Sequence, residues 1–182
     1  YCIMKILKIL GFTVLTLVVI YIVLGLVGPS TYKVERELLI DASPTKVWSQ
    51  VSDFNAWENW SPWKEKDPTM VNTIEGTPAS IGHSNSWSGN PETSGKGGMT
   101  FTSIEENKSL TYDLSFTEPW EMSSTGGFTL TEQDGKTLIN WYDTGDIPFA
   151  QRPMMLFMDL DQMMGPDRKS TRLNLQSRGH LV

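Results

Sequence analysis

Few side chains in this sequence have both the type and the setting of a catalytic group. His83, in the stretch IGHSNSW, is the single histidine before residue 167 and could act as a general base. A surface or hydrogen-bonded histidine is the commoner case, and that alternative stays open. Arg36, in the first predicted strand, and Glu121 could each place a polar group inside a pocket. His83, Arg36 and Glu121 are therefore the candidate catalytic residues.

Other familiar catalytic arrangements do not occur in the sequence. The pair Glu105–Glu106 lies in a predicted turn, and Asp159–Asp161 have an i, i+2 spacing that does not share a helix face. Cys2 is the only cysteine, which excludes an intramolecular disulfide and a cysteine metal site. No P-loop, nucleophile elbow, HExxH motif or dinucleotide fingerprint occurs. We predict no metal and no cofactor, and the sequence favours a non-enzymatic protein without deciding the question.

The stretch FNAWENWSPW places an aromatic residue at every third position from Phe54 to Trp63. Tryptophan contributes most where a large apolar area must be covered. We predict that these rings close one mouth of an apolar pocket, with further aromatic residues and a methionine along its walls. A plain hydrophobic core and contact with a membrane surface are the alternatives. The candidate ligand-binding residues are Trp57, Trp60, Trp63, Trp87, Phe101, Phe116, Phe128, Trp141 and Met155.

The periodicity predicts one strand, two short helices and then six antiparallel strands. Residues 32–42 alternate as a strand, and Ser43-Pro44 marks the start of a helix. The stretch 54–63 forms a short helix or turn, and Asp134-Gly135 is typical of a two-residue hairpin turn. The later strands are predicted at 70–76, 82–89, 96–105, 109–117, 122–132 and 136–144, before the approach to a C-terminal helix.

The chain carries no charge from Ile9 to Tyr32. About 20 apolar helical residues span about 30 Å, the thickness of a bilayer core. A cleaved signal peptide and a buried core helix are the alternatives, and the run lacks both a small-residue cleavage site and a polar face. Lys5 and Lys8 before the run place the N-terminus in the cytoplasm. We predict a single-pass anchor over residues 4–28 and an extracytoplasmic domain, periplasmic or at the cell surface.

Both ends of the sequence contain stretches that we expect not to belong to the protein. Met4 begins MKILKIL, an ordinary opening for an anchor, so residues 1–3 are expected to be upstream read-through. Residues 167–182 contain four Lys and Arg residues and no aromatic ones, and DRKSTRLN resembles a translated sequencing adapter. We expect a non-native tail there and an incomplete domain over residues 29–166. A genuine basic tail is the alternative.

The net charge of residues 29–166 is strongly negative. They contain 9 Lys and Arg residues against 20 Asp and Glu residues, a net charge of −11. Phosphate binding needs a basic face, so this composition excludes nucleic acid as a partner. It also opposes flat binding of the domain to anionic lipid. The predicted partners are a hydrophobic small molecule or lipid, and the membrane through the N-terminal helix.

Three stretches resemble the helix-grip superfamily, also called START-like or SRPBCC, which includes polyketide cyclase/dehydrase and Bet v 1-like proteins. YKVERELLIDASPTKVWSQVSDFNAWENWSPW is similar to the family's opening, with A-x-P-x-x-V-W and W-x-x-W-S-P-W. KGGMTFTSIEENKSLTYDLSF is similar to its central hairpin, and IPFAQRPMMLFMDLDQMMG resembles a stretch of its membrane-anchored members. The resemblance covers about residues 4 to 166. It implies an α+β fold in which a curved antiparallel sheet grips a long C-terminal helix, most of which is missing here.

The resemblance also implies an apolar cavity between the sheet and that helix. From this cavity and the lack of catalytic motifs we hypothesise a membrane-anchored module that binds a hydrophobic small molecule or lipid. The first alternative is a cyclase-like enzyme that shapes an aromatic or polyketide substrate in the pocket. The second is a structural or regulatory domain without a ligand. The family alone does not choose among them, because one fold hosts many functions.

Overall fold

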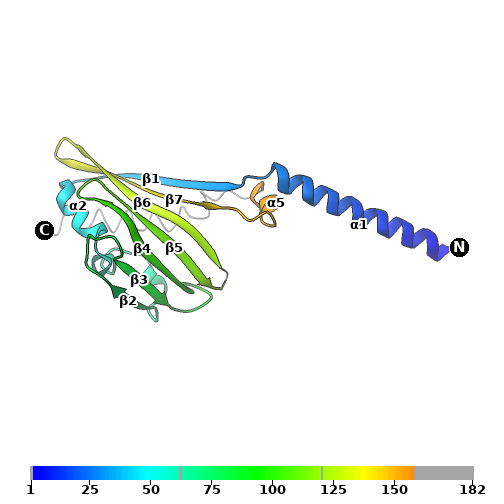
Figure 1. Ribbon diagram of the computed structural model, residues 1–182, viewed down its shortest axis with the longest axis horizontal. Coiled ribbons are helices and arrows are strands. Elements are labelled where there is room, and N and C mark those ends of the chain that lie inside the picture. Colours follow the sequence, from blue (N-terminus) through cyan, green and yellow to red (C-terminus); the bar gives the residue numbers. More distant parts are fainter. Residues whose placement is uncertain (1, 62, 120, 158–182) are drawn as a thin grey trace. The chain divides into compact units, whose positions relative to one another are not determined.

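The computed structural model describes residues 2–61, 63–119 and 121–157 (Figure 1). Among these, contacts divide the chain into two units, one with the residues up to Tyr32 and from Asp146 onward, the other with Lys33–Gly145. The expected C-terminal helix beyond residue 157 and the tail at 167–182 lie outside the described residues. The helices are α1 (Cys2–Val27), α2 (Pro44–Val51), α3 (Phe54–Trp57), α4 (Trp63–Lys66) and α5 (Arg152–Met155). The strands are β1 (Thr31–Ile40), β2 (Val71–Glu75), β3 (Ser84–Ser88), β4 (Lys96–Glu105), β5 (Ser109–Glu118), β6 (Met122–Gln133) and β7 (Lys136–Asp146).

The strands form one seven-stranded sheet in the order β1-β7-β6-β5-β4-β3-β2 (Figure 1). From β2 to β7, each strand pairs antiparallel with the next one along the chain. Asp134 and Gly135 both have positive φ in the β6–β7 turn, which confirms the predicted hairpin. The register of β4 shifts between Phe101 and Ser103, and such a bulge bends a strand. The predicted α+β fold is confirmed, and every predicted strand end lies within two residues of the observed one.

The core lies between α2, α3 and one face of the sheet, which we call the inner face. Ser43 has the extended backbone of an N-cap, but its side chain makes no capping bond, and Pro44 opens α2. Asp53 caps α3 by accepting a hydrogen bond from the Asn55 N–H at 2.9 Å. The buried cluster comprises Leu38, Ile40, Val47, Trp48, Val51, Phe54, Trp57, Trp60, Phe101, Leu110, Tyr112, Phe128, Leu130 and Ile139.

Trp57 lies inside this cluster, with 8% of its surface exposed. Its ring meets the Phe128 ring nearly edge-on, with 5.8 Å between the centroids. Its indole N–H donates to the Val51 carbonyl at 2.9 Å, and the Trp60 indole N–H donates to the Gln50 carbonyl at 3.0 Å. These bonds satisfy the polar edge of each ring and tie the residues after α2 to the end of that helix.

The buried carboxylate of Asp67 holds the loop between β3 and β4. Oδ1 accepts hydrogen bonds from the backbone N–H and the hydroxyl of Thr69. Oδ2 accepts from the Asn90 N–H and from the hydroxyls of Thr93 and Ser94. These bonds lower the pKa of Asp67 well below its usual range, and the bond from Ser94 contributes most. This role of Asp67 was not predicted from the sequence.

In the other unit, α1 is long and apolar enough to cross a membrane. Its candidate span, Met4–Val27, has 24 residues, and a window of 18 of them has a mean hydropathy of 2.7 with only 6% of its residues buried. This exposure argues against a core helix within the described chain. Length and composition suit a membrane anchor and a signal sequence equally.

Asp67→Asn should lower the midpoint of thermal unfolding at pH 7, because an amide offers one acceptor oxygen to donors that now share two. The pKa of Asp67 is lowered by folding, so its stabilising effect is present above the unfolded pKa of about 3.9. That effect is lost as pH falls toward the folded value, and the difference between wild type and variant should shrink below about pH 4. Circular dichroism of the detergent-solubilised chain measures both midpoints. Asp113→Asn, at an exposed position of β5, is the matched control. An equal effect of the two variants would count against a structural role of the Asp67 hydrogen bonds.

Trp57→Ala should reduce the free energy of unfolding by about 3–5 kcal/mol, because the variant leaves a large cavity in the core. Trp63→Ala, at a partly exposed position, should cost less than half as much. Urea unfolding followed by circular dichroism gives both values. Equal losses would mean that the core does not depend on Trp57 in particular.

Candidate functional site

His83 lies one residue before β3, not within a strand as predicted, and its ring is buried. Nε2 accepts a hydrogen bond from the Phe54 N–H at 3.1 Å, and Nδ1–H donates to the Glu75 carbonyl at 2.9 Å. This arrangement requires the neutral tautomer with the proton on Nδ1. Asp53 Oδ1 also lies 3.5 Å from Nε2. Since backbone groups occupy both nitrogens, the geometry favours a structural role that ties α3 to the end of β2.

Arg36 and Glu121, the other candidate catalytic residues, lie on different elements. Arg36 is partly buried in β1, in phase with Val34 and Leu38, and its Nη1 donates to the Glu35 carbonyl at 2.6 Å. Glu121 is exposed just before β6. Four strands stand between β1 and β3 in the sheet, so the fold does not bring Arg36 to His83. Among the described residues, no group of three or more His, Cys, Asp or Glu side chains could hold a metal ion.

Four of the candidate ligand-binding residues lie in the core. The exposed fractions are 8% for Trp57, 2% for Trp60, and 0% for both Phe101 and Phe128. The Phe101 ring lies against the Phe54 ring, with 4.4 Å between the centroids and 32° between the planes. These rings fill the core between the helices and the inner face of the sheet. Their contact with a ligand stays a prediction.

Three other candidates, Trp87, Phe116 and Trp141, are only partly buried and lie on the inner face. Trp87 and Phe116 meet edge-to-face, with 5.4 Å between centroids and 76° between planes. A Cβ added to Gly97 would come within 2.4 Å of the Trp87 ring, so this glycine lets the indole lie across β4. The Trp141 indole N–H donates to the Tyr112 hydroxyl at 2.8 Å.

The last two candidates lie elsewhere. Trp63 begins α4, and the Lys66 ammonium lies 5.1 Å from its ring centroid. Met155 ends α5, in the unit that contains α1. The predicted contact of these residues with a ligand stays a prediction.

The strand register places two neighbouring rows of side chains on the inner face beyond the core, and we call them the distal rows. One row runs across β3 to β6 through Trp87, Gly97, Phe116 and Met122, and the other through Asn85, Met99, Leu114 and Ser124. Most of these side chains are apolar, and all but Ser124 keep part of their surface exposed. The distal rows therefore form a partly exposed apolar surface.

A buried polar pair joins the end of the second distal row to β7. Ser124 and Asp143 are 8% and 3% exposed, and the Ser124 hydroxyl donates to Asp143 Oδ2 at 3.4 Å. Asp143 lies opposite Gly126 in the β6–β7 register. A few polar groups in an apolar setting are typical of ligand pockets. This pair was not predicted from the sequence, although Asp143 is in phase with Trp141, a candidate ligand-binding residue.

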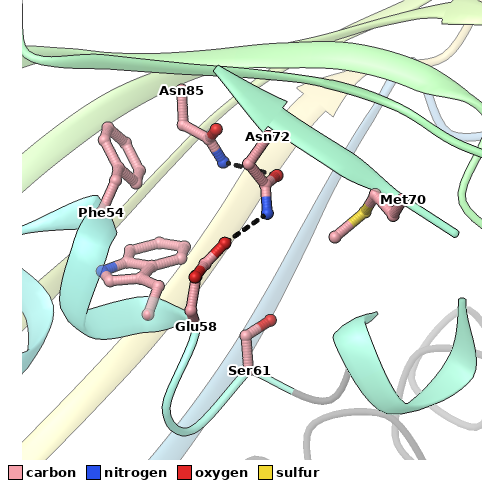
Figure 2. Close-up of a pocket in the computed structure, with 7 residues that line it drawn as sticks. Phe54, Glu58, Ser61, Met70, Asn72 and Asn85 are labelled. Atoms are coloured by element: carbon pink, nitrogen blue, oxygen red, sulfur yellow. Dashed lines mark hydrogen bonds between the residues drawn. The ribbon is translucent and has the colours of Figure 1, made fainter. Parts of the chain in front are cut away.

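A small pocket lies between α3 and the edge of the sheet (Figure 2). At its rim, Asn85 Nδ2 donates to Asn72 Oδ1 at 3.4 Å, and Asn72 Nδ2 donates to Glu58 Oε1 at 3.2 Å. Its volume is about 40 Å³, room for about three water molecules and too little for a lipid. Its lining comprises Phe54, Trp57, Glu58, Ser61, Met70, Asn72 and Asn85.

Several solved structures share this fold. The Aha1 dimer from Colwellia psychrerythraea is 16% identical with a TM-score of 0.58, over 81% of this chain and 95% of that one. Protein MLL2253 from Mesorhizobium loti is 20% identical with a TM-score of 0.57, over 80% and 98% of the two chains. The di-domain ARO/CYC StfQ from the steffimycin biosynthetic pathway is 10% identical with a TM-score of 0.60, over 81% of this chain and 50% of that one. At these identities the likeness shows the fold alone.

A comparison with curated protein sequences gives no match. Residues 31–160 match the sequence profile of the family described as polyketide cyclase / dehydrase and lipid transport. This match covers most of the chain, including all seven strands and the helices α2 and α3 that pack on the inner face. The chain therefore belongs to the polyketide cyclase / dehydrase and lipid transport family.

Proposed function

We propose that this protein is a membrane-anchored module that binds a hydrophobic small molecule or lipid on the inner face of its sheet. The observation that carries the proposal is the apolar surface of the distal rows, with the Ser124–Asp143 pair beside it. Apolar surface that stays in water costs about 25 cal/mol of free energy for each Å², relative to the same surface when it is buried. A hydrophobic ligand that covers the distal rows would recover part of this free energy.

The membership of the family supports the same function. The family's description includes lipid transport as well as cyclase and dehydrase activity. The geometry favours binding over proton transfer, because backbone groups occupy both nitrogens of His83. The Ser124–Asp143 pair would orient a polar group of the ligand, as the few polar groups of an apolar pocket usually do.

The anchor is the second part of the proposal. α1 exposes apolar side chains along most of its length and carries Lys5 and Lys8 near its beginning. This charge favours a cytoplasmic N-terminus and an extracytoplasmic binding unit. Residues 28–30 alone separate α1 from β1, so the tether is short. A ligand drawn from the bilayer fits both features.

Native mass spectrometry of the detergent-purified chain tests the binding. The wild type should retain a small-molecule adduct that organic solvent extracts. Phe116→Asp should reduce the adduct-bearing fraction about tenfold, because it puts a charge where an apolar side chain contributes about 1.5–3 kcal/mol. Phe116→Ala, which adds no charge, should reduce the fraction less.

Thr117→Asp is the matched control, because Thr117 is exposed on the opposite face of the same strand. Lipids held around α1 would affect all variants alike, so only a difference between positions 116 and 117 reports on the inner face. A wild type without an extractable adduct, or equal adducts in Phe116→Asp and Thr117→Asp, would refute the proposal.

A further inference from the structure

Residues 147–157, IPFAQRPMMLF, form an unusually apolar segment that follows β7 and contains α5. Arg152 is its only charged residue. Three of its large side chains, Met154, Leu156 and Phe157, are exposed by 52%, 40% and 81%. So many exposed apolar side chains in a short segment usually mark a surface that another apolar partner covers.

The 147–157 segment packs on one face of α1. Tyr21, Gly25 and Gly28 lie four and three residues apart, so they share this face. The Tyr21 hydroxyl donates to the Ala150 carbonyl at 2.7 Å. A Cβ added to Gly25 would lie 2.6 Å from the Phe149 ring, so the glycine makes room for this aromatic side chain.

Further contacts fix the 147–157 segment at the end of α1. A Cβ added to Gly28 would lie 2.7 Å from the Arg152 carbonyl oxygen. The Ile147 N–H donates to the Ser30 carbonyl at 2.8 Å, and Arg152 Nε–H donates to the Ile147 carbonyl at 3.0 Å. The segment is therefore held against the last two turns of the helix by packing and by hydrogen bonds.

The length of α1 indicates the depth at which this contact lies in a membrane. The span Met4–Val27 has 24 residues and a length of about 36 Å, against about 30 Å for a bilayer core. With Lys5 and Lys8 held at one surface, the last turn of α1 reaches the opposite interface. The docked 147–157 segment lies beside that turn.

We propose that the 147–157 segment is a second membrane contact, which docks on the Tyr21–Gly25–Gly28 face and inserts its exposed side chains among the lipids at the interface. A single cation among apolar side chains suits an interfacial element, because the charged head can stay at the headgroup level. The last turn of α1 also exposes apolar side chains, since Leu26 and Val27 are 71% and 72% exposed. The proposal rests on the membrane anchor of the proposed function.

Site-directed spin labelling of the full chain in phosphatidylcholine liposomes tests this contact. In a Cys2→Ser background, one nitroxide is attached at Phe157→Cys, Leu15→Cys or Ile81→Cys. Leu15 lies within α1, and Ile81 is a 69% exposed apolar residue of the other unit. Labels at 157 and 15 should collide more with oxygen than with a water-soluble nickel chelate. The label at 81 should show the reverse, severalfold.

Two glycine substitutions in α1 test the docking. Gly25→Leu removes the space that the Phe149 ring occupies, so nickel access and mobility of the label at 157 should rise. Gly11→Leu is the matched control, because an added Cβ there meets nothing within 4 Å. It should leave the label at 157 unchanged.

The outcomes separate the proposal from the anchor on which it rests. A label at 157 that behaves like the one at 81, while the label at 15 stays in lipid, overturns the second contact and leaves the anchor standing. A label at 15 open to the nickel chelate overturns both. A third outcome is a label at 157 that neither reagent reaches and that shows spin–spin coupling, which decreases when unlabelled chain is added. This result would mean that a second copy of the chain covers the segment, and it would overturn the proposal.

Discussion

The unit from Lys33 to Gly145 depends on the packing of a few aromatic rings from the residues after α2 against the inner face of the sheet. Trp57, Trp60 and Phe54 are each at most 8% exposed. Burial of each such ring contributes about 1.5–3 kcal/mol or more, and the whole domain is stable by only about 5–15 kcal/mol. These rings pack on the part of the inner face that contains Phe101 and Leu130, and the apolar side chains of the distal rows keep part of their surface exposed.

Hydrogen bonds to the backbone identify several buried polar side chains as parts of the fold. The indole N–H groups of Trp57 and Trp60 and both nitrogens of His83 bond to the backbone. A buried polar group without a partner costs about 1–3 kcal/mol, so these bonds are part of the fold. Ser124 and Asp143 bond to each other through their side chains, next to the apolar surface of the distal rows that carries the proposed function.

The sequence was sufficient for the strands, because their residues alternate between two faces and their turns have strong local signals. The alternation in LTYDLSF predicts that Leu110, Tyr112, Leu114 and Phe116 share one face, and the register of β5 confirms this prediction. The roles of His83 and Asp67 could not be predicted, because their partners, such as Phe54 and Ser94, lie 29 and 27 residues away in the chain. Nor does alternation distinguish a core ring from a partly exposed one.

The contact of the α1 glycines with the 147–157 segment could not be predicted from the sequence either, for a different physical reason. In a bilayer, lipid tails are as apolar as leucine, so a helix gains little by burying apolar side chains against another element. Close packing on small residues and hydrogen bonds hold such contacts together, which is what Gly25, Gly28 and Tyr21 provide. β1 and β7 are neighbours in the sheet, and the chain enters β1 from α1 and leaves β7 into the 147–157 segment. Both of these chain segments belong to one unit, in which the Ile147 N–H donates to the Ser30 carbonyl at 2.8 Å.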